Sequence, residues 1–89
     1  MVASPQELKL RSGTCVVGAA RGVDLVIDSP AVSRRHLEVE LVPEGLRVTD
    51  LGSRNGTFYL DQRIERAVLA PGACVRLGDV ELSFEIYSA

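Results

Sequence analysis

The chain has 89 residues, 46% of them hydrophobic and 25% charged, which is the balance of one small globular domain with no room for a second core. The net charge of −2 argues against nucleic-acid binding over the whole surface, because such contact needs many basic side chains against phosphates. No stretch approaches the ~20 apolar residues of a membrane span, and the start lacks the pattern of a secretory signal. We therefore expect a cytoplasmic protein that contacts neither nucleic acid nor a membrane.

The first predicted elements are short strands, because glycines and prolines interrupt the whole chain. Residues 15–17 and 25–27 are continuous apolar runs, typical of strands buried on both faces. Cys15 and Cys74 both lie in such apolar runs, so we expect two buried, reduced thiols, with one disulfide as the alternative. One histidine and two distant cysteines have no metal-ligand spacing, and no phosphate-binding glycine loop occurs, so neither a metal nor a cofactor is expected.

The middle of the chain predicts a hairpin. From residue 37 to residue 41, apolar and charged residues alternate strictly, which fits a strand and not a helix. Residues 46–49 repeat the pattern after a turn signal at residues 43–45. Residues 61–69 are ambiguous, since their apolar residues fall at helical spacing and Asp61 is a suitable helix cap.

The last predicted strand is the clearest. Val80, Leu82, Phe84 and Ile86 share one face of it, so we expect Phe84 to be buried between two sheets. Residues 75–77 pair naturally with this strand across a turn at residues 78–79. Short strands at this spacing predict an all-β sandwich or barrel.

Two polar loops flank the predicted hairpin, at residues 33–36 before it and residues 50–57 after it. Both loops should emerge at the same end of the sheet, and their hydroxyl, guanidinium and amide groups are donors that hold a phosphate or a peptide backbone. A tight turn, a solvated arginine pair and a histidine that fixes the backbone are the plainer interpretations. Ser33 has no nucleophile elbow around it and no triad is present, so we expect no enzyme activity.

The two loops carry a family resemblance. The chain has Ser33-Arg34-Arg35-His36 and then Asp50-Leu51-Gly52-Ser53-Arg54-Asn55-Gly56-Thr57. This pair of motifs resembles the forkhead-associated (FHA) domain, whose hallmarks are Ser-Arg-x-His and Leu-Gly-Ser-x-Asn-Gly-Thr. The resemblance covers about residues 15–86, so residues 1–89 are interpreted as a single FHA-like domain. It implies a two-sheet antiparallel β-sandwich in which residues 61–69 are loop and strand.

The resemblance also implies a function, recognition of phosphothreonine peptides in signal transduction. Ser33 resembles the hydroxyl donor to the phosphate, Arg34 its neighbour that also reaches the phosphate, and Asn55 the amide that grips the peptide backbone. Arg54 stands where the family often has a threonine, a position that the resemblance places beside the ligand. By the same resemblance, three residues have structural roles in holding the loops in place: His36, Gly56 and Gly18.

Three departures from the family pattern matter. The family usually has Gly-Arg where this chain has Gly18-Ala19, so a direct phosphate ligand is missing, and Leu60 replaces a frequent asparagine. Arg21, Arg34 and Arg54 are the candidates to compensate. The third departure is the lack of residues for the first family strand, which leaves an open edge or indicates a piece of a longer protein.

These departures keep two functions open. The first is a phosphothreonine-binding module, and the alternative is a phosphate-independent docking or self-association module on the same fold. The Gly18-Ala19 variant and the residues from Asn55 to Arg63 also resemble the N-terminal FHA domains of bacterial sigma-54-dependent transcriptional regulators. By that resemblance, the domain is the sensory part of a longer regulator.

Overall fold

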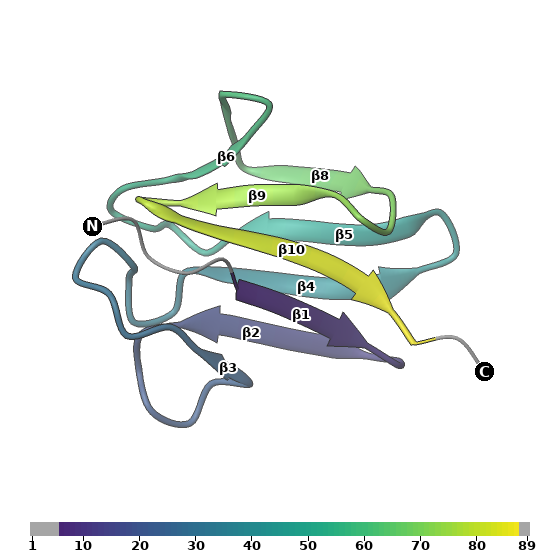
Figure 1. Ribbon diagram of the computed structural model, residues 1–89, viewed down its shortest axis with the longest axis horizontal. Coiled ribbons are helices and arrows are strands. Elements are labelled where there is room, and N and C mark those ends of the chain that lie inside the picture. Colours follow the sequence, from purple (N-terminus) through teal and green to yellow (C-terminus); the bar gives the residue numbers. More distant parts are fainter. Residues whose placement is uncertain (1–5, 88–89) are drawn as a thin grey trace.

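Two five-stranded β-sheets face each other in the computed structural model, which describes residues 6–87 (Figure 1). One sheet has the order β1-β10-β9-β6-β7 and the other the order β3-β2-β4-β5-β8. The strands are β1 (Gln6–Leu10), β2 (Thr14–Gly18), β3 (Leu25–Val26), β4 (Leu37–Val42), β5 (Gly45–Asp50), β6 (Thr57–Tyr59), β7 (Gln62–Ile64), β8 (Arg66–Leu69), β9 (Cys74–Leu77) and β10 (Val80–Ile86). The predicted all-β, two-sheet sandwich is confirmed.

Both predicted hairpins are present. β4 and β5 pair antiparallel with Leu41 opposite Leu46, and β9 and β10 pair with Leu77 opposite Val80. The ambiguous residues 61–69 form β7 and β8, and β8 pairs antiparallel with β5. Tertiary pairing therefore overrides the helical spacing of that segment.

The core lies between the sheets, because successive side chains of a strand alternate between the core and the outer face. Phe84 on β10 in one sheet, and Val39 and Val48 on central strands of the other, have no exposed surface. The predicted burial of Phe84 is confirmed. Ile86, at the end of the same strand, is only half-buried.

Most strand pairs are antiparallel, but β1 pairs parallel with β10, and β2 parallel with β3. β1 is an edge strand, and within residues 6–87 no strand pairs with its outer side. No helix in the same residues is long and apolar enough to cross a membrane.

Two expectations about apolar runs were wrong. Neither run is buried on both faces: Val16 is half-buried while Val17 is fully buried, and Val26 is 46% exposed on the short edge strand β3. The reason is that each sheet covers the core with only one face. Cys15 and Cys74 are free thiols as expected, but Cys15 is half-buried and Cys74 is exposed on the outer face of β9.

Candidate functional site

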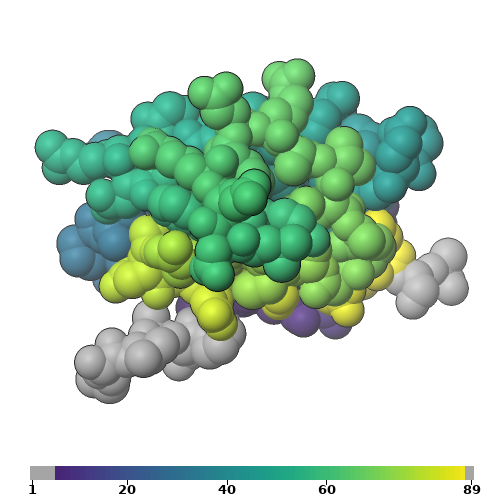
Figure 2. All heavy atoms as spheres, turned by 90° about the horizontal axis from the view of Figure 1, so that it is seen from above, coloured from purple at the N-terminus to yellow at the C-terminus, as the bar shows by residue number. Residues whose placement is uncertain are grey.

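Three loops meet at one end of the sandwich, where β2 and β5 end and β4 begins (Figure 1, left). They are the 19–24 loop after β2, the 27–36 loop before β4 and the 51–56 loop after β5. In the space-filling view, the blue and teal atoms of the second and third loops again gather at one end (Figure 2). The strand topology thus brings the polar loops together, as the hairpin predicted.

The 19–24 and 27–36 loops are joined through their backbones. Ala19 N–H donates to the Ser33 carbonyl at 2.9 Å, and Ala20 N–H donates to the Arg34 carbonyl at 3.1 Å. Gly18 makes this approach possible, because a Cβ atom there would lie 2.0 Å from the Arg34 carbonyl oxygen. The structural role predicted for Gly18 therefore has a steric cause.

His36 ties the 27–36 loop to the 51–56 loop from a position with no exposed surface. Ser33 N–H donates to His36 Nδ1 at 3.1 Å, and His36 Nε2 lies 2.9 Å from the Gly56 carbonyl oxygen. Because Nδ1 must accept and the carbonyl must accept, the tautomer with its proton on Nε2 satisfies both bonds. We expected a buried ring bonded either to the backbone or to a loop side chain such as Ser53 or Thr57, and the structure shows the first of these, with two backbone partners.

Asp50 holds the 51–56 loop in shape, a role that the family motif did not assign to it. Its carboxylate accepts from Ser53 N–H at 2.8 Å, from Ser53 Oγ at 2.6 Å and from Thr57 Oγ1 at 2.8 Å. Ser53 Oγ in turn accepts from Gly56 N–H at 3.0 Å. The sequence signal for this turn is an aspartate three residues before a serine.

These contacts also set the acidity of Asp50. Burial raises the pKa of its carboxyl, but the hydrogen bonds from Ser53 and Thr57, together with the nearby His36, outweigh burial and lower the pKa below its ordinary value. The carboxylate is therefore ionised at neutral pH, when its lone pairs are all available as acceptors.

Four of the predicted binding residues line one hollow of about 320 Å³. Ser33 Oγ accepts from Arg54 N–H at 3.0 Å, which leaves the Ser33 hydroxyl proton to donate. Asn55 Nδ2 donates to the Ala31 carbonyl at 2.9 Å, which leaves the amide oxygen and one N–H of Asn55. Arg34 and Arg54 are both exposed and also line this hollow. We call it the Ser33 hollow.

Arg21 lies elsewhere, in an adjoining hollow of about 500 Å³ that also includes Arg34 and Arg35. None of the four arginines Arg21, Arg34, Arg35 and Arg54 forms an ion pair with another described residue, since the ion pair found in residues 6–87 joins Arg47 and Glu40. Arg21 is thus a neighbour of the Ser33 hollow and does not line it.

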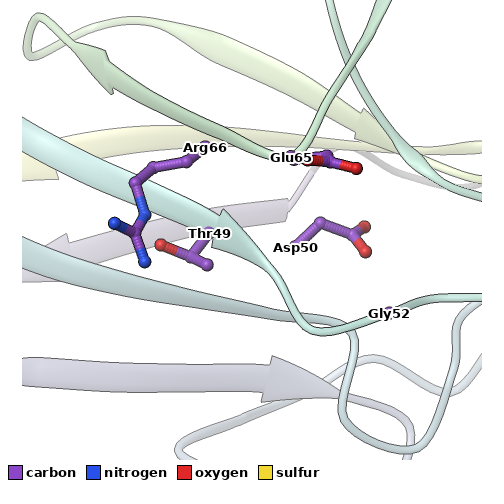
Figure 3. Close-up of a pocket in the computed structure, with 5 residues that line it drawn as sticks. All are labelled: Thr49, Asp50, Gly52, Glu65 and Arg66. Carbon is purple, nitrogen blue, oxygen red and sulfur yellow. The ribbon is translucent and has the colours of Figure 1, made fainter.

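A further hollow of about 470 Å³ lies beside β5 and β8 (Figure 3). The carboxylates of Asp50 and Glu65 line it, and the guanidinium of Arg66 extends to the side of Thr49. Two carboxylates repel a phosphate, so this hollow does not suit an anion. Among the described residues, no group of three or more His, Cys, Asp or Glu is placed to hold a metal ion.

Leu60 is the other departure from the family pattern, and it lies in the β6–β7 turn. It is 78% exposed and has a φ of 52°, in the left-handed region. It does not line the Ser33 hollow.

Comparisons with known proteins identify the fold family. A family model for FHA-like domains, Yop-YscD_cpl, described as "Inner membrane component of T3SS, cytoplasmic domain", matches residues 3–88. A solved structure from a "Structural and functional analysis of phosphothreonine-dependent FHA domain interactions" superposes with a TM-score of 0.75 and 33% identity, over 81% of this chain and 75% of that one. The chain belongs to the family of FHA domains.

Other FHA relatives are bacterial regulators. The glycogen accumulation regulator GarA of Mycobacterium tuberculosis is 41% identical over 61 residues, 68% of this chain and 38% of GarA. EmbR of the same organism, solved in complex with a low-affinity phosphopeptide, has a TM-score of 0.77 and 29% identity, over 86% of this chain and 21% of EmbR. This FHA domain therefore spans about two fifths of GarA and one fifth of EmbR.

Proposed function

We propose that this FHA domain binds a phosphothreonine-bearing protein segment as a signalling module, and that it is not an enzyme. The observation that carries the proposal is the Ser33 hydroxyl, whose oxygen accepts from Arg54 N–H while its proton is left to donate into a hollow that Arg34 also lines. A hydroxyl and guanidiniums together are donors suited to a phosphate dianion. Asn55, at the same hollow, has an amide oxygen and an N–H for the peptide backbone.

The affinity should be weaker than is usual for the family. Ala19 stands where the family carries an arginine that binds phosphate, and Arg21 lies in the adjoining hollow. One hydrogen bond to a charged group contributes about 1.5–3 kcal/mol. Its loss corresponds to a roughly tenfold to hundredfold weaker affinity.

We further propose that the domain is the sensory part of a cytoplasmic transcriptional regulator of the sigma-54-dependent class. Support comes from the resemblance of its motif region to such regulators and from the similarity to EmbR, a transcriptional regulatory protein. An ATPase domain and a helix-turn-helix encoded downstream in the same gene would support this proposal. A full-length gene without them would overturn it.

Titration of a phosphothreonine peptide library into the 15N-labelled domain, at low salt, tests the binding proposal. We expect amide shifts at Ser33, Arg34, Arg54 and Asn55, and loss of binding when the peptide is dephosphorylated. Ser33→Ala and Arg34→Ala should each weaken binding about tenfold or more, because each removes a charge-assisted bond. Glu81→Ala is the control, since Glu81 is exposed on β10 and does not line the Ser33 hollow.

A folded domain that binds no phosphopeptide under these conditions would overturn the proposal. Binding that survives dephosphorylation would do the same, and would favour the phosphate-independent docking module. Self-association would then appear as a concentration-dependent molecular mass in the absence of peptide.

A further inference from the structure

The hollow next to the Ser33 hollow has the features of a second binding subsite. It measures about 500 Å³, against about 320 Å³ for the Ser33 hollow, and the two share Arg34. Its lining consists of Ala20, Arg21, Gly22, Val23, Arg34 and Arg35. A ligand that fills both hollows would pass over Arg34 and would contact both the 27–36 loop and the 19–24 loop.

The second hollow is positively charged and unneutralised. Three arginines line it, Arg21, Arg34 and Arg35, and no acidic residue does. All three side chains are exposed, and none forms an ion pair within residues 6–87. Three unpaired cations at one place in a chain of net charge −2 make a local positive field that favours an anion.

Asp24 is the acidic residue closest in sequence to this hollow, and its carboxylate is engaged elsewhere. Asp24 Oδ2 accepts from Val16 N–H at 2.7 Å, on the side of β2. The Asp24 N–H in turn donates to the Val16 carbonyl at 2.9 Å. The Asp24 carboxylate is thus bonded to the backbone of β2 and forms no ion pair with Arg21.

The backbone of the second hollow is held at both sides. The 19–24 loop is fixed at its end by the Asp24–Val16 pair and at its start by the bond from Ala20 N–H to the Arg34 carbonyl, 3.1 Å. The absence of a side chain at Gly18 lets the two loops touch. Loops fixed before a ligand arrives lose less conformational entropy on binding, so the backbones that carry the three arginines need little ordering when an anion binds.

We propose that this second hollow is an anion subsite that takes a carboxylate or a phosphate on a residue near the phosphothreonine of the same segment. The inference rests on the proposed function, in which the Ser33 hollow takes the phosphothreonine. The planar guanidinium fork binds both carboxylate and phosphate through paired N–H donors, which is why both groups fit. The preferred partner is therefore an acidic or doubly phosphorylated segment.

Calorimetric titration with three sets of synthetic peptides tests the inference. The first peptide carries one phosphothreonine and alanine at the flanking positions. The second set adds one glutamate, at each flanking position in turn, and the third adds one phosphoserine at the same positions. We expect at least one position at which the added charge strengthens binding about three- to tenfold, the range for a partly exposed ion pair formed with two arginines.

A matched pair of charge-removing variants assigns the gain to the second hollow. Arg35→Gln should bring the ratio of affinities for the doubly and singly charged peptides down toward one. Arg66→Gln removes the same charge from β8, at the opposite edge of the sheet from β3, and should leave the ratio as it is. Both side chains are exposed, so neither change should unfold the domain.

The outcomes separate the two proposals. Binding of the singly phosphorylated peptide without any gain from a second charge would overturn the second subsite and leave the proposed function intact. A gain that Arg35→Gln does not reduce, or that Arg66→Gln reduces equally, would also overturn it. Failure of all three peptide sets would overturn both. A gain with phosphoserine alone, or with glutamate as well, tells which anion the subsite takes.

Discussion

Asp50 is the side chain on which the shape of the 51–56 loop depends most. Three hydrogen bonds from Ser53 and Thr57 converge on its carboxylate, while the His36 side chain contacts the same loop through the Gly56 carbonyl. The Asp-x-x-Ser spacing is visible in the sequence. The backbone partners of His36 cannot be read from the sequence, because nearly every residue has the same N–H and C=O groups and only the fold brings particular ones together.

Asp50→Asn should make the fold less stable in a pH-dependent way. The fold lowers the pKa of the Asp50 carboxyl from its ordinary value, so the carboxylate stabilises the fold above the unfolded-state pKa, and this contribution is lost as the pH falls through the folded-state pKa. We expect a loss of about 1 kcal/mol at pH 7, because the amide removes one of the acceptors. Urea unfolding at pH 7 and at pH 3 should show the difference between the two proteins shrinking at pH 3.

Asp28→Asn is the matched control for that experiment. Asp28 is exposed and forms no side-chain hydrogen bond or ion pair with another described residue, so its variant should differ little from the parent at either pH. An equal loss for Asp50→Asn at pH 7 and pH 3 would contradict the stabilising role of the ionised form.

Among the elements, the strands with alternating residues were predictable and the edges were not. β4, β5, β9 and β10 alternate apolar and polar residues, and each presents one face to the core. β3 is only two residues long, and its exposure follows from its place at a sheet edge, which is a property of the topology. The pairing of β8 with β5 decided the segment whose spacing also fitted a helix.

The end of β2 is the element that positions the candidate site, so Gly18→Ala should separate the loops. The new Cβ would lie 2.0 Å from the carbonyl oxygen of Arg34 and 2.7 Å from its carbon, both backbone atoms that cannot move aside alone. We expect a loss of about 1–3 kcal/mol in stability, as for other overpacking changes. Phosphopeptide affinity should fall as well, since the Ser33 and Arg34 backbone must shift.

Gly72→Ala separates the effect on the site from the effect on stability. Gly72 lies in the turn between β8 and β9, with a φ of +91°, and a Cβ atom added there would have no other atom within 4 Å. Its alanine variant should lose about 1–2 kcal/mol through left-handed strain and keep its affinity. If both glycine variants retain the parental affinity, the close approach at Gly18 does not position the site.

For the whole molecule, the order of the strands explains why the grouping of the candidate site residues could be predicted while their division between two hollows could not. Loops on either side of one hairpin must meet at one end, and this places Ser33, Arg34, Arg54 and Asn55 around one hollow. The separation of Arg21 into a second hollow depends on the path of the 19–24 loop. That path is fixed by backbone contacts across the loops and is not encoded in the spacing of residues.

The stability of the whole sandwich should depend strongly on Phe84, which is fully buried between its two sheets. Phe84→Ala should cost about 3–5 kcal/mol, through lost apolar contacts and the cavity left behind. Proteins have about 0.05–0.15 kcal/mol of stability per residue, so this loss is a large part of what an 89-residue chain holds. Phe58→Ala makes the same chemical change at a half-buried ring that lies under Arg76, and it should cost clearly less. Thermal unfolding followed by circular dichroism gives the melting temperature of each variant. Equal melting temperatures for the two variants would contradict this prediction, because a core position and an outer-face position would then be equivalent.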